Sequence, residues 1–254
     1  LRDFVKNNNS FKSIYNYSFA NEVFNNVVIK GGVNYFLYEQ GYKGAVDFYN
    51  CKNGDKKKQT RALFEEGLDI ILSSSEDFEL IQKVQNVDFV SFTNITKGRN
   101  AFGIIGKEAT LKKIAKKDYF EEAVELHCKA EEILWVCKKE ITKNLDLVDK
   151  YKVYISKSAG DPSKDLKVIG KPHVGKPNSA CTDSLIPVGD FNTLIEAENL
   201  AKYMKTKFLR YLVSILKTSQ NVTQIVYKFV PLQDFTANSD IDWSKTISEI
   251  DQQL

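Results

Sequence analysis

Clustered and alternating apolar residues, punctuated by glycine, predict strands in the first part of the chain. Residues 11–17 alternate apolar and polar side chains, residues 27–29 and 33–38 flank a glycine pair, and residues 45–50 follow a glycine-containing turn. Aromatic and β-branched residues dominate these runs, which is typical of strands. The lysine-rich segment 54–58 is predicted to be a polar loop.

The strongest helix prediction covers residues 193–218. Thr193 and Glu196 have the spacing of a capping box, in which the two side chains bond each other's backbone amides. A broad apolar stripe follows at helical spacing, made by Leu194, Ala197, Leu200, Ala201, Met204, Phe208, Tyr211, Leu212, Ile215 and Leu216. A second helix is expected at 74–86, where Ser74 or Ser75 precedes two acidic residues.

The remaining segments mix short strands, loops and one further helix. Strands are predicted at the apolar runs 133–136, 152–155, 185–188 and 225–231. The segment 159–180 is rich in proline and glycine and is predicted to be a loop, and the tail 244–254 is predicted to begin a helix. We therefore expect an α+β fold with mixed sheet elements, a loop-rich domain and one long amphipathic helix at 193–218.

Composition excludes disorder for the chain as a whole. Its 254 residues are 43% hydrophobic and 27% charged, and the net charge of +3 permits a polyanionic partner without requiring one. No apolar run approaches the roughly 20 residues of a membrane helix. No basic-then-apolar signal segment opens the chain. We expect a cytoplasmic protein with no membrane partner.

Recognisable catalytic motifs are missing from the sequence. It has no G-x-S-x-G, P-loop, G-x-G-x-x-G or H-E-x-x-H segment. A metal-dependent nuclease would need two carboxylates and a lysine in a P-D…(D/E)-x-K arrangement. Asp161-Pro162 reverses the first part, and Glu140 lies one position too far from Lys143 for the second. The sequence therefore predicts no catalytic residue and no metal ligand.

Cysteine and histidine are scattered along the chain. No cysteine pair has the C-x-x-C spacing of a zinc or redox site, so free thiols in a reducing compartment are expected. The cysteines are Cys51, Cys128, Cys137 and Cys181. His127 falls in a predicted helix and is expected to be structural, whereas His173 lies in the loop-rich segment, where contact with a ligand is more plausible.

Basic and polar residues in two predicted loops are the sequence features that point to nucleic-acid binding. The first loop holds Lys97, Arg99 and Asn100, and the second holds Lys171, His173, Lys176, Asn178, Ser179 and Thr182. Lysine and arginine could pair with phosphates, while amide and hydroxyl side chains could bond base edges. Composition alone favours the alternative of ordinary solvated loops.

The predicted long helix carries a second basic feature. From residue 203 to Gln220 there is no acidic residue, and Lys207, Arg210 and Lys217 are spaced to share one face. Such a face could follow a phosphate backbone. The alternative is that cations suit the C-terminal half of a helix, where the dipole is negative.

Six short motifs occur in order along nearly the whole chain. They are IKGGVNYFL (29–37), Ser91 with AFGI (101–104), DKYKV (149–153), NSACT (178–182), AENL with KTKFLR (197–200 and 205–210), and VPLQDF with DW (230–235 and 242–243). Together they resemble the motifs of type IIG-like restriction–modification adenine-N6 DNA methyltransferases. Ala101 stands where that family usually has proline.

The resemblance implies a fragment of such a protein. In that family the IKGGV segment follows an Asn-Pro-Pro-Tyr catalytic motif, in the last strands of the methyltransferase fold. That motif and any cofactor-binding glycine motif are absent here, and the chain opens at Leu1 on residues that read as the middle of a helix. Residues 1–55 are thus expected to be tail strands of a methyltransferase-like fold, and residues 56–254 a DNA target-recognition domain.

The same resemblance implies a function. The chain would bind double-stranded DNA and read a short site, with Asn100, Asn178, Ser179, Thr182 and Gln220 as the candidates for base edges. It would present a flipped adenine to catalytic residues outside this chain. S-adenosylmethionine, and Mg²⁺ if the whole protein also cleaves, would be cofactors of that protein and not of this fragment, which we expect to be inactive alone.

Two other functions stay open on the sequence. One is a self-contained Mg²⁺-dependent nuclease fragment of a restriction enzyme. The other is a domain that assembles restriction–modification subunits through the apolar stripe of the long helix. In the DNA-recognition interpretation, the expected partners besides double-stranded DNA are the remainder of its own polypeptide or restriction–modification subunits.

Overall fold

The protein was analysed as a computed structural model. It describes residues 2–7, 10–24, 29, 32–85, 88–106, 114–115, 121–129, 132–159, 168–217 and 219–254. Several sequence predictions fall partly outside these ranges, namely those on residues 27–28, 30–31, 86, 161–162 and 218. The structure is an α+β fold with mixed and antiparallel sheets, which confirms the predicted class.

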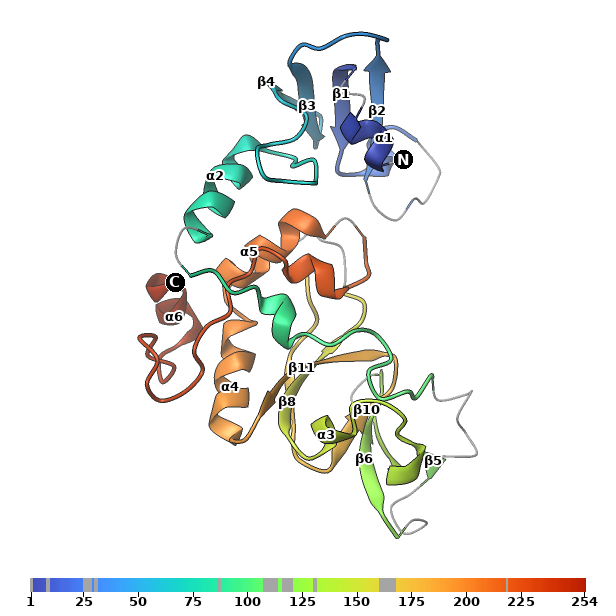
Figure 1. The fold of residues 1–254 in the computed structure, drawn as a ribbon, viewed down its shortest axis with the longest axis vertical. Coiled ribbons are helices and arrows are strands. Elements are labelled where there is room, and N and C mark those ends of the chain that lie inside the picture. Colours follow the sequence, from blue (N-terminus) through green and yellow to red (C-terminus); the bar gives the residue numbers. More distant parts are fainter. Residues whose placement is uncertain are drawn as a thin grey trace. The chain divides into compact units, whose positions relative to one another are not determined.

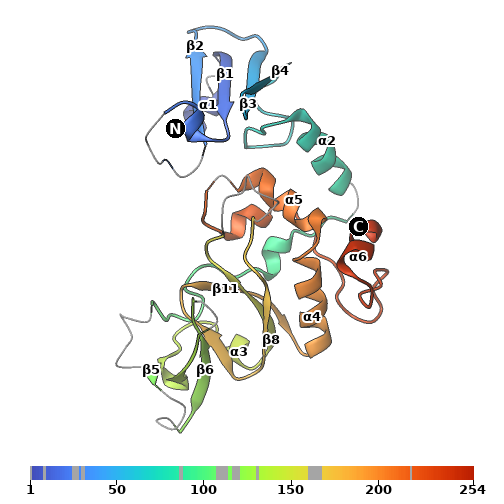
Figure 2. The ribbon, with the colours of Figure 1, turned by 180° about the vertical axis from the view of Figure 1, so that it is seen from behind.

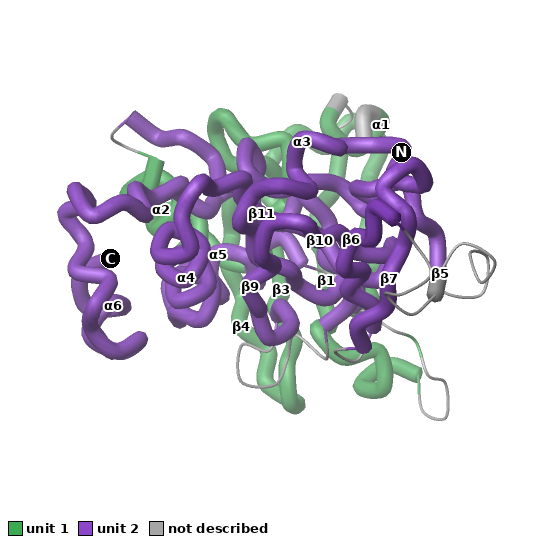
Figure 3. The backbone as a smooth tube through the Cα atoms, turned by 90° about the horizontal axis from the view of Figure 1, so that it is seen from below, with its two compact units in different colours: residues 1–87 green, residues 88–254 purple. Residues whose placement is uncertain are grey.

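The chain divides into two compact units, residues 1–87 and 88–254 (Figure 3). Unit 1 contains α1 (Arg2–Asn7), β1 (Phe11–Tyr17), the 3-10 helix η1 (Ala20–Glu22), β2 (Val33–Tyr38), β3 (Val46–Lys52), β4 (Asp55–Arg61) and α2 (Ser75–Val84). The boundary expected between residues 55 and 56 falls inside the β3–β4 hairpin, so it does not separate compact units. Whether unit 1 continues a methyltransferase fold stays a prediction.

Unit 1 is built on a four-stranded sheet in the order β2-β1-β3-β4. Strand β1 pairs antiparallel with β2 and parallel with β3. One face of the sheet carries the core, made by Phe11, Ile14, Val46, Phe48 and Leu63. The predicted strands 11–17, 33–38 and 45–50 are confirmed, as is the helix capped by Ser74, whose side chain accepts a hydrogen bond from the Glu76 amide.

The predicted loop 54–58 is wrong, because residues 55–58 belong to strand β4. Lys56 and Lys58 pair with Cys51 and Tyr49 across an antiparallel hairpin. The turn is Asn53-Gly54, where both residues have positive φ, 56° and 82°. Asn-Gly is the residue pair that a two-residue hairpin turn favours. The lysines therefore lie on an edge strand, where charged side chains discourage further pairing.

Unit 2 holds two further sheets, in the orders β10-β6-β7-β5 and β11-β8-β9. Its elements are η2 (Phe92–Ile95), β5 (Ile114–Ala115), β6 (Ala123–His127), β7 (Ile133–Cys137), η5 (Lys138–Glu140), α3 (Leu145–Val148), β8 (Tyr151–Ser156), β9 (His173–Gly175), β10 (Ser179–Cys181), β11 (Leu185–Phe191), α4 (Leu194–Tyr203), α5 (Lys207–Leu216), η6 (Gln224–Tyr227) and α6 (Ile247–Gln253). Helix α4 lies alongside β8 and β11 (Figures 1 and 2).

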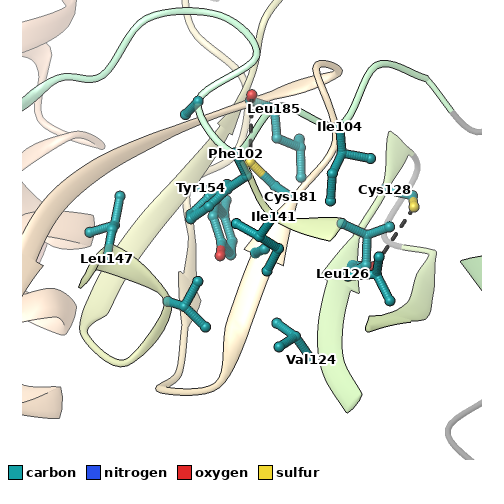
Figure 4. Close-up of a cluster of buried hydrophobic side chains, with 14 residues drawn as sticks. Phe102, Ile104, Val124, Leu126, Cys128, Ile141, Leu147, Tyr154, Cys181 and Leu185 are labelled. Carbon is teal, nitrogen blue, oxygen red and sulfur yellow. Dashed lines mark hydrogen bonds between the residues drawn. The ribbon is translucent and has the colours of Figure 1, made fainter. Parts of the chain in front are cut away.

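A buried cluster joins the two sheets of unit 2. Phe102, Leu126 and Tyr154 come from a loop and from both sheets and pack among the apolar side chains shown in Figure 4. His127, predicted to be helical, ends strand β6 instead. The predicted strand 225–231 is also wrong, since residues 224–227 form a 3-10 helix. The strands predicted at 133–136, 152–155 and 185–188 and the tail helix are confirmed.

The single helix predicted at 193–218 is two helices. α4 begins with the predicted capping box of Thr193 and Glu196 and ends at Tyr203, and α5 begins after Thr206. The Thr206 side chain accepts a hydrogen bond from the Leu209 amide and so caps a new helix. Part of the apolar stripe is buried in unit 2, namely Ala197, Leu200 and Leu212, whereas Leu194 and Tyr211 are exposed. Within the described residues, no helix has the length and apolarity to cross a membrane.

Candidate nucleic-acid interface

A hollow of about 520 Å³ in unit 2 brings together basic side chains that are far apart in the sequence. Lys171 precedes β9, Lys205 lies between α4 and α5, and Arg210 belongs to α5. The other lining residues are neutral: Ser158, Ala159, Ile169, Gly170 and Pro172. We call this site the basic hollow. Among the described residues that line it are three cations and no carboxylate, so it suits an anionic group.

Backbone contacts build the walls of the basic hollow. The Ala159 amide donates to the carbonyl of Gln220 at 3.0 Å, and Ser158 forms an isolated bridge with Asn221. These contacts place Gln220, a predicted base contact, directly beside two lining residues. On the other side, a Cβ at Gly170 would come within 3.2 Å of the Ser156 Cβ. Glycine at this position lets the lining segment pack closely on β8.

The break between the two helices sets the position of Lys205. Its amide donates to the Lys202 carbonyl at 2.9 Å, which closes the last turn of α4. The Thr206 hydroxyl is buried and donates to the Tyr203 carbonyl at 2.7 Å. Lys205 is therefore held at the surface between two helices by the residues on either side of it.

Arg210 is half-buried on α5, unlike the solvated lysines near it. Its Nε donates to the Met204 carbonyl at 3.3 Å. Burial lowers the pKa of its guanidinium, and the nearby Tyr227 acts in the opposite direction. An arginine remains charged at neutral pH despite such a shift. The structure thus presents a fixed cation at the hollow.

Contrary to the sequence prediction, Lys217 does not share the basic face of Lys207 and Arg210. Lys207 is exposed on the first turn of α5. Lys217 is buried, because α5 ends at Leu216 and Lys217 is its extended C-cap. The helical periodicity that placed Lys217 beside Arg210 does not extend to it, so Lys217 is excluded from the interface.

Arg99 reaches the surface while forming an ion pair. Its side chain is 67% exposed, and its Nη2 lies 2.9 Å from Asp183 Oδ2. Lys157 Nζ donates to the same oxygen at 2.8 Å, and the Gly106 amide donates to Oδ1 at 2.8 Å. Burial alone would raise the pKa of Asp183, but these hydrogen bonds outweigh it and lower the pKa to about 2. Asp183 therefore neutralises part of the positive charge of Arg99.

The turn that carries Arg99 is anchored to β11. The Lys97 amide donates to the Pro187 carbonyl at 3.1 Å, and Thr96 bridges Val188. Asn100 adopts a left-handed conformation with φ of 59°. Its side-chain oxygen is buried and has no hydrogen-bond partner among the described residues. That atom is therefore turned away from a ligand at the surface.

The second predicted loop divides into exposed and buried residues. Lys176 and Asn178 are exposed, and the Asn178 side-chain amide donates to the Ala123 carbonyl at 3.0 Å. Ser179 and Thr182 are buried in and beside β10, so their hydroxyls do not reach the surface and we exclude them as base contacts. Part of the predicted loop instead forms the short strands β9 and β10, which pair with β8 and β6. Ser179 is buried as part of β10.

His173 lies on β9 in a cluster of aromatic rings. Its ring centroid is 5.4 Å from that of His127 and 5.5 Å from that of Tyr154. His127 Nε2 lies 2.9 Å from Glu125 Oε1. Burial is the main cause that lowers the pKa of His127, against the raising effect of Glu125. His173 is half-buried in this cluster, which gives it a structural role in addition to any ligand contact.

Lys152, which the sequence did not single out, supports the turn that carries Lys176 and Asn178. Its buried ammonium donates to the carbonyls of Leu147 and Val148 at 2.9 Å, and to that of Lys176 at 3.3 Å. Burial lowers its pKa to about 8, so it is mostly charged at neutral pH. The ammonium thereby ties the end of α3 to the turn.

The structure thus brings together only part of the predicted set. Lys171, Arg210 and the backbone of Gln220 meet at the basic hollow, and Lys205 joins them although it was not predicted as a contact. Lys97 and Arg99 lie on a separate turn. In the part of the chain that the structure describes, no group of three or more His, Cys, Asp or Glu side chains could hold a metal ion.

Comparison with known proteins finds a likeness among solved structures alone. No family model matches the chain, and no curated protein matches it. Among solved structures it is similar to the type IIG restriction endonuclease BpuSI, at 12% sequence identity and a TM-score of 0.37. The match covers 98% of this chain and 39% of that enzyme, so the chain spans well under half of its length. An overlap this loose transfers neither a fold nor an activity.

Proposed function

We propose that this chain binds double-stranded DNA through the basic hollow of unit 2. The observation that carries the proposal is the convergence of Lys171, Lys205 and Arg210 around one hollow, whose described lining residues include no carboxylate. Phosphate contacts from lysine and arginine supply most of the sequence-independent affinity of DNA-binding proteins. Exposed Lys207, one turn before Arg210, extends the positive charge along α5.

Two exposed amide side chains are candidates for reading bases, one beside the hollow and one on a separate turn. Gln220 is exposed and its backbone is fixed beside the hollow, while Asn178 is exposed at a turn held by Lys152. Amide side chains can make paired hydrogen bonds to adenine in the major groove. A backbone that is held in place allows such contacts to be made with little loss of entropy.

The biological role follows from the ordered motifs in the sequence. We propose that the chain is the target-recognition part of a restriction–modification protein and positions DNA for adenine methylation by residues outside it. S-adenosylmethionine would bind to those other residues. A self-contained Mg²⁺-dependent nuclease remains the second candidate, and no specific contact in the described residues favours it. Of the apolar stripe proposed for subunit assembly, Ala197, Leu200, Ala201, Met204 and Leu212 are buried as core.

The recognition role can be tested by selection from a pool of duplexes with a randomised central segment. Bound DNA is recovered at moderate salt, amplified and sequenced over several rounds. Enrichment of one short site supports target recognition. Binding without any enriched site would reduce the function to non-specific DNA binding, and cleavage of the pool in Mg²⁺ would favour the nuclease.

A further inference from the structure

A row of tyrosine rings crosses one face of the sheet in unit 1. Tyr35 on β2, Tyr15 on β1 and Tyr49 on β3 are directly opposite one another in the strand register. The ring centroids of Tyr15 and Tyr35 are 4.8 Å apart with planes 15° from parallel, and those of Tyr15 and Tyr49 are 4.3 Å apart at 2°. The three rings therefore form one continuous stack.

Tyr17 adds a fourth ring beside the stack, and its hydroxyl forms a pair with that of Tyr35. Its ring lies 5.8 Å from that of Tyr35, and the two hydroxyl oxygens are 3.5 Å apart. The hydrogen bond to Tyr35 is the main cause that raises the pKa of Tyr17. Only one proton can lie between the two oxygens, so the other can be donated to an acceptor outside the protein.

Lysines of the edge strand β4 flank the stack. Lys56 Nζ lies 5.9 Å from the centroid of Tyr15, and Lys58 Nζ lies 5.8 Å from that of Tyr49. The β3–β4 hairpin, residues 46–61, has five cations and two carboxylates, a net charge of 5 − 2 = +3, which equals that of the whole chain. Lys58 is paired with Asp47, which leaves Lys56 as the stronger cation on this face.

The stack lies on the side of the sheet away from the core. Along β3 the side chains alternate between the two faces, and Val46 and Phe48 are buried on the face opposite Tyr49. Tyr35 is 46% exposed on edge strand β2, and both ring partners found for it in the described residues come from β1. The side of the Tyr35 ring away from β1 is where another aromatic ring could extend the stack.

We propose that this surface, defined by Tyr15, Tyr17, Tyr35, Tyr49, Lys56 and Lys58 and named the tyrosine face, binds single-stranded nucleic acid. A base would stack on Tyr35, a contact that any base can make. The hydroxyl pair and Lys56 would receive phosphate oxygens, which the positive charge of the hairpin attracts. A duplex hides the faces of its bases and could use only the charge. The site is distinct from the basic hollow and does not depend on it.

The test uses the full chain carrying Lys171→Glu and Lys205→Glu, so that the basic hollow does not contribute. Affinity for a fluorescein-labelled oligothymidine is measured by anisotropy at low salt, with oligouridine as a second probe. Tyr35→Ala is compared with Tyr38→Ala, which removes an exposed tyrosine from the opposite face of the same strand. Lys56→Glu is compared with Lys57→Glu, an equal charge change on the opposite face.

The tyrosine face predicts about a tenfold loss of affinity for Tyr35→Ala and retained affinity for Tyr38→Ala. Lys56→Glu should weaken binding more than Lys57→Glu, a comparison that stands even if Tyr35→Ala does not fold. Tyr35→Phe keeps the ring and loses one hydroxyl of the pair, so it should bind more tightly than Tyr35→Ala. Equal affinity for both oligomers would show that the tyrosine face binds single-stranded DNA and RNA alike. A higher affinity for oligothymidine would identify single-stranded DNA as its ligand. Equal losses within each pair, competition by heparin as effective as by the oligomer, or no binding at all would overturn the proposal.

Discussion

The carboxylate of Asp251 accepts a hydrogen bond from the backbone amide of Lys207 at 2.9 Å. Its other oxygen accepts one from the Phe208 amide at 3.0 Å. Asp251 lies on α6, so the last helix of the chain supplies an anion to the first turn of α5, where amides lack partners within their own helix. The Asp251 carboxylate offsets the partial positive charge at the N-terminal end of α5. We therefore attribute the positive charge at the basic hollow to the side chains of Lys171, Lys205 and Arg210.

Replacing Asp251 by asparagine should lower the free energy of unfolding by about 1 kcal/mol, because a neutral amide is a weaker partner for the two backbone amides. Urea denaturation measures this change. Asp240→Asn, at an exposed acidic position, is the matched control and should alter stability by a few tenths of a kcal/mol. Equal stability of the two variants would contradict a capping role for Asp251.

Thr206 should be needed for the second helix. Thr206→Ala removes both the bond from the Leu209 amide and the bond to the Tyr203 carbonyl, and should lower the unfolding free energy by about 1–2 kcal/mol. Thr206→Ser keeps the hydroxyl and should lose much less. Thermal or urea unfolding of the pair measures the difference, and an alanine variant as stable as the serine variant would rule the cap out.

The same threonine shows why the sequence predicted one helix. The apolar stripe continues in phase from α4 into α5, so hydrophobic periodicity gives no sign of a break. The cap signal was incomplete, since Thr206 has Leu209 three residues later, whereas Thr193 has Glu196 and forms a full capping box. Fold class and most strands could be predicted from local pattern, and the break depends on a hydroxyl that tertiary packing buries.

The error at β4 had an available signal. Lys56 and Lys58 suggested a loop by charge, yet Asn53-Gly54 before them is the sequence of a tight hairpin turn. For the candidate site, Lys171 and Arg210 were identified by their charge. Lys205 was missed because only the packing of a distant loop against α5 brings it to the hollow. Burial of Ser179 and Lys217 also depends on strand pairing and helix ends that composition does not reveal.

Asp183 predicts a pH dependence of stability. Its pKa is lowered from 3.8 to about 2 in the folded protein, so its stabilisation is fully present above about pH 4 and is lost as the pH falls toward 2. Asp183→Asn should therefore be less stable than the unmodified chain at neutral pH, by roughly 1–2 kcal/mol after allowance for water around exposed Arg99. The difference in unfolding free energy between the two proteins should become smaller as the pH falls from about 4 to about 2.

Urea unfolding of both proteins across this pH range measures the effect of Asp183. Asp240→Asn serves again as the control, and its difference from the unmodified chain should stay small at every pH. A gap for Asp183→Asn that is constant or grows on acidification would show that the ion pairs with Lys157 and Arg99 do not stabilise the fold.

The most direct measurement is the salt dependence of duplex binding by the unmodified chain and by the Lys171→Glu/Lys205→Glu variant. Lys139→Glu/Lys143→Glu, which makes the same charge change at exposed positions outside the hollow, is the control. We predict that the hollow variant binds much more weakly and that its slope of log affinity against log salt falls by roughly two units, while the control keeps the slope. Equal binding by the two variants, or no duplex binding by the unmodified chain at low salt, would contradict the account.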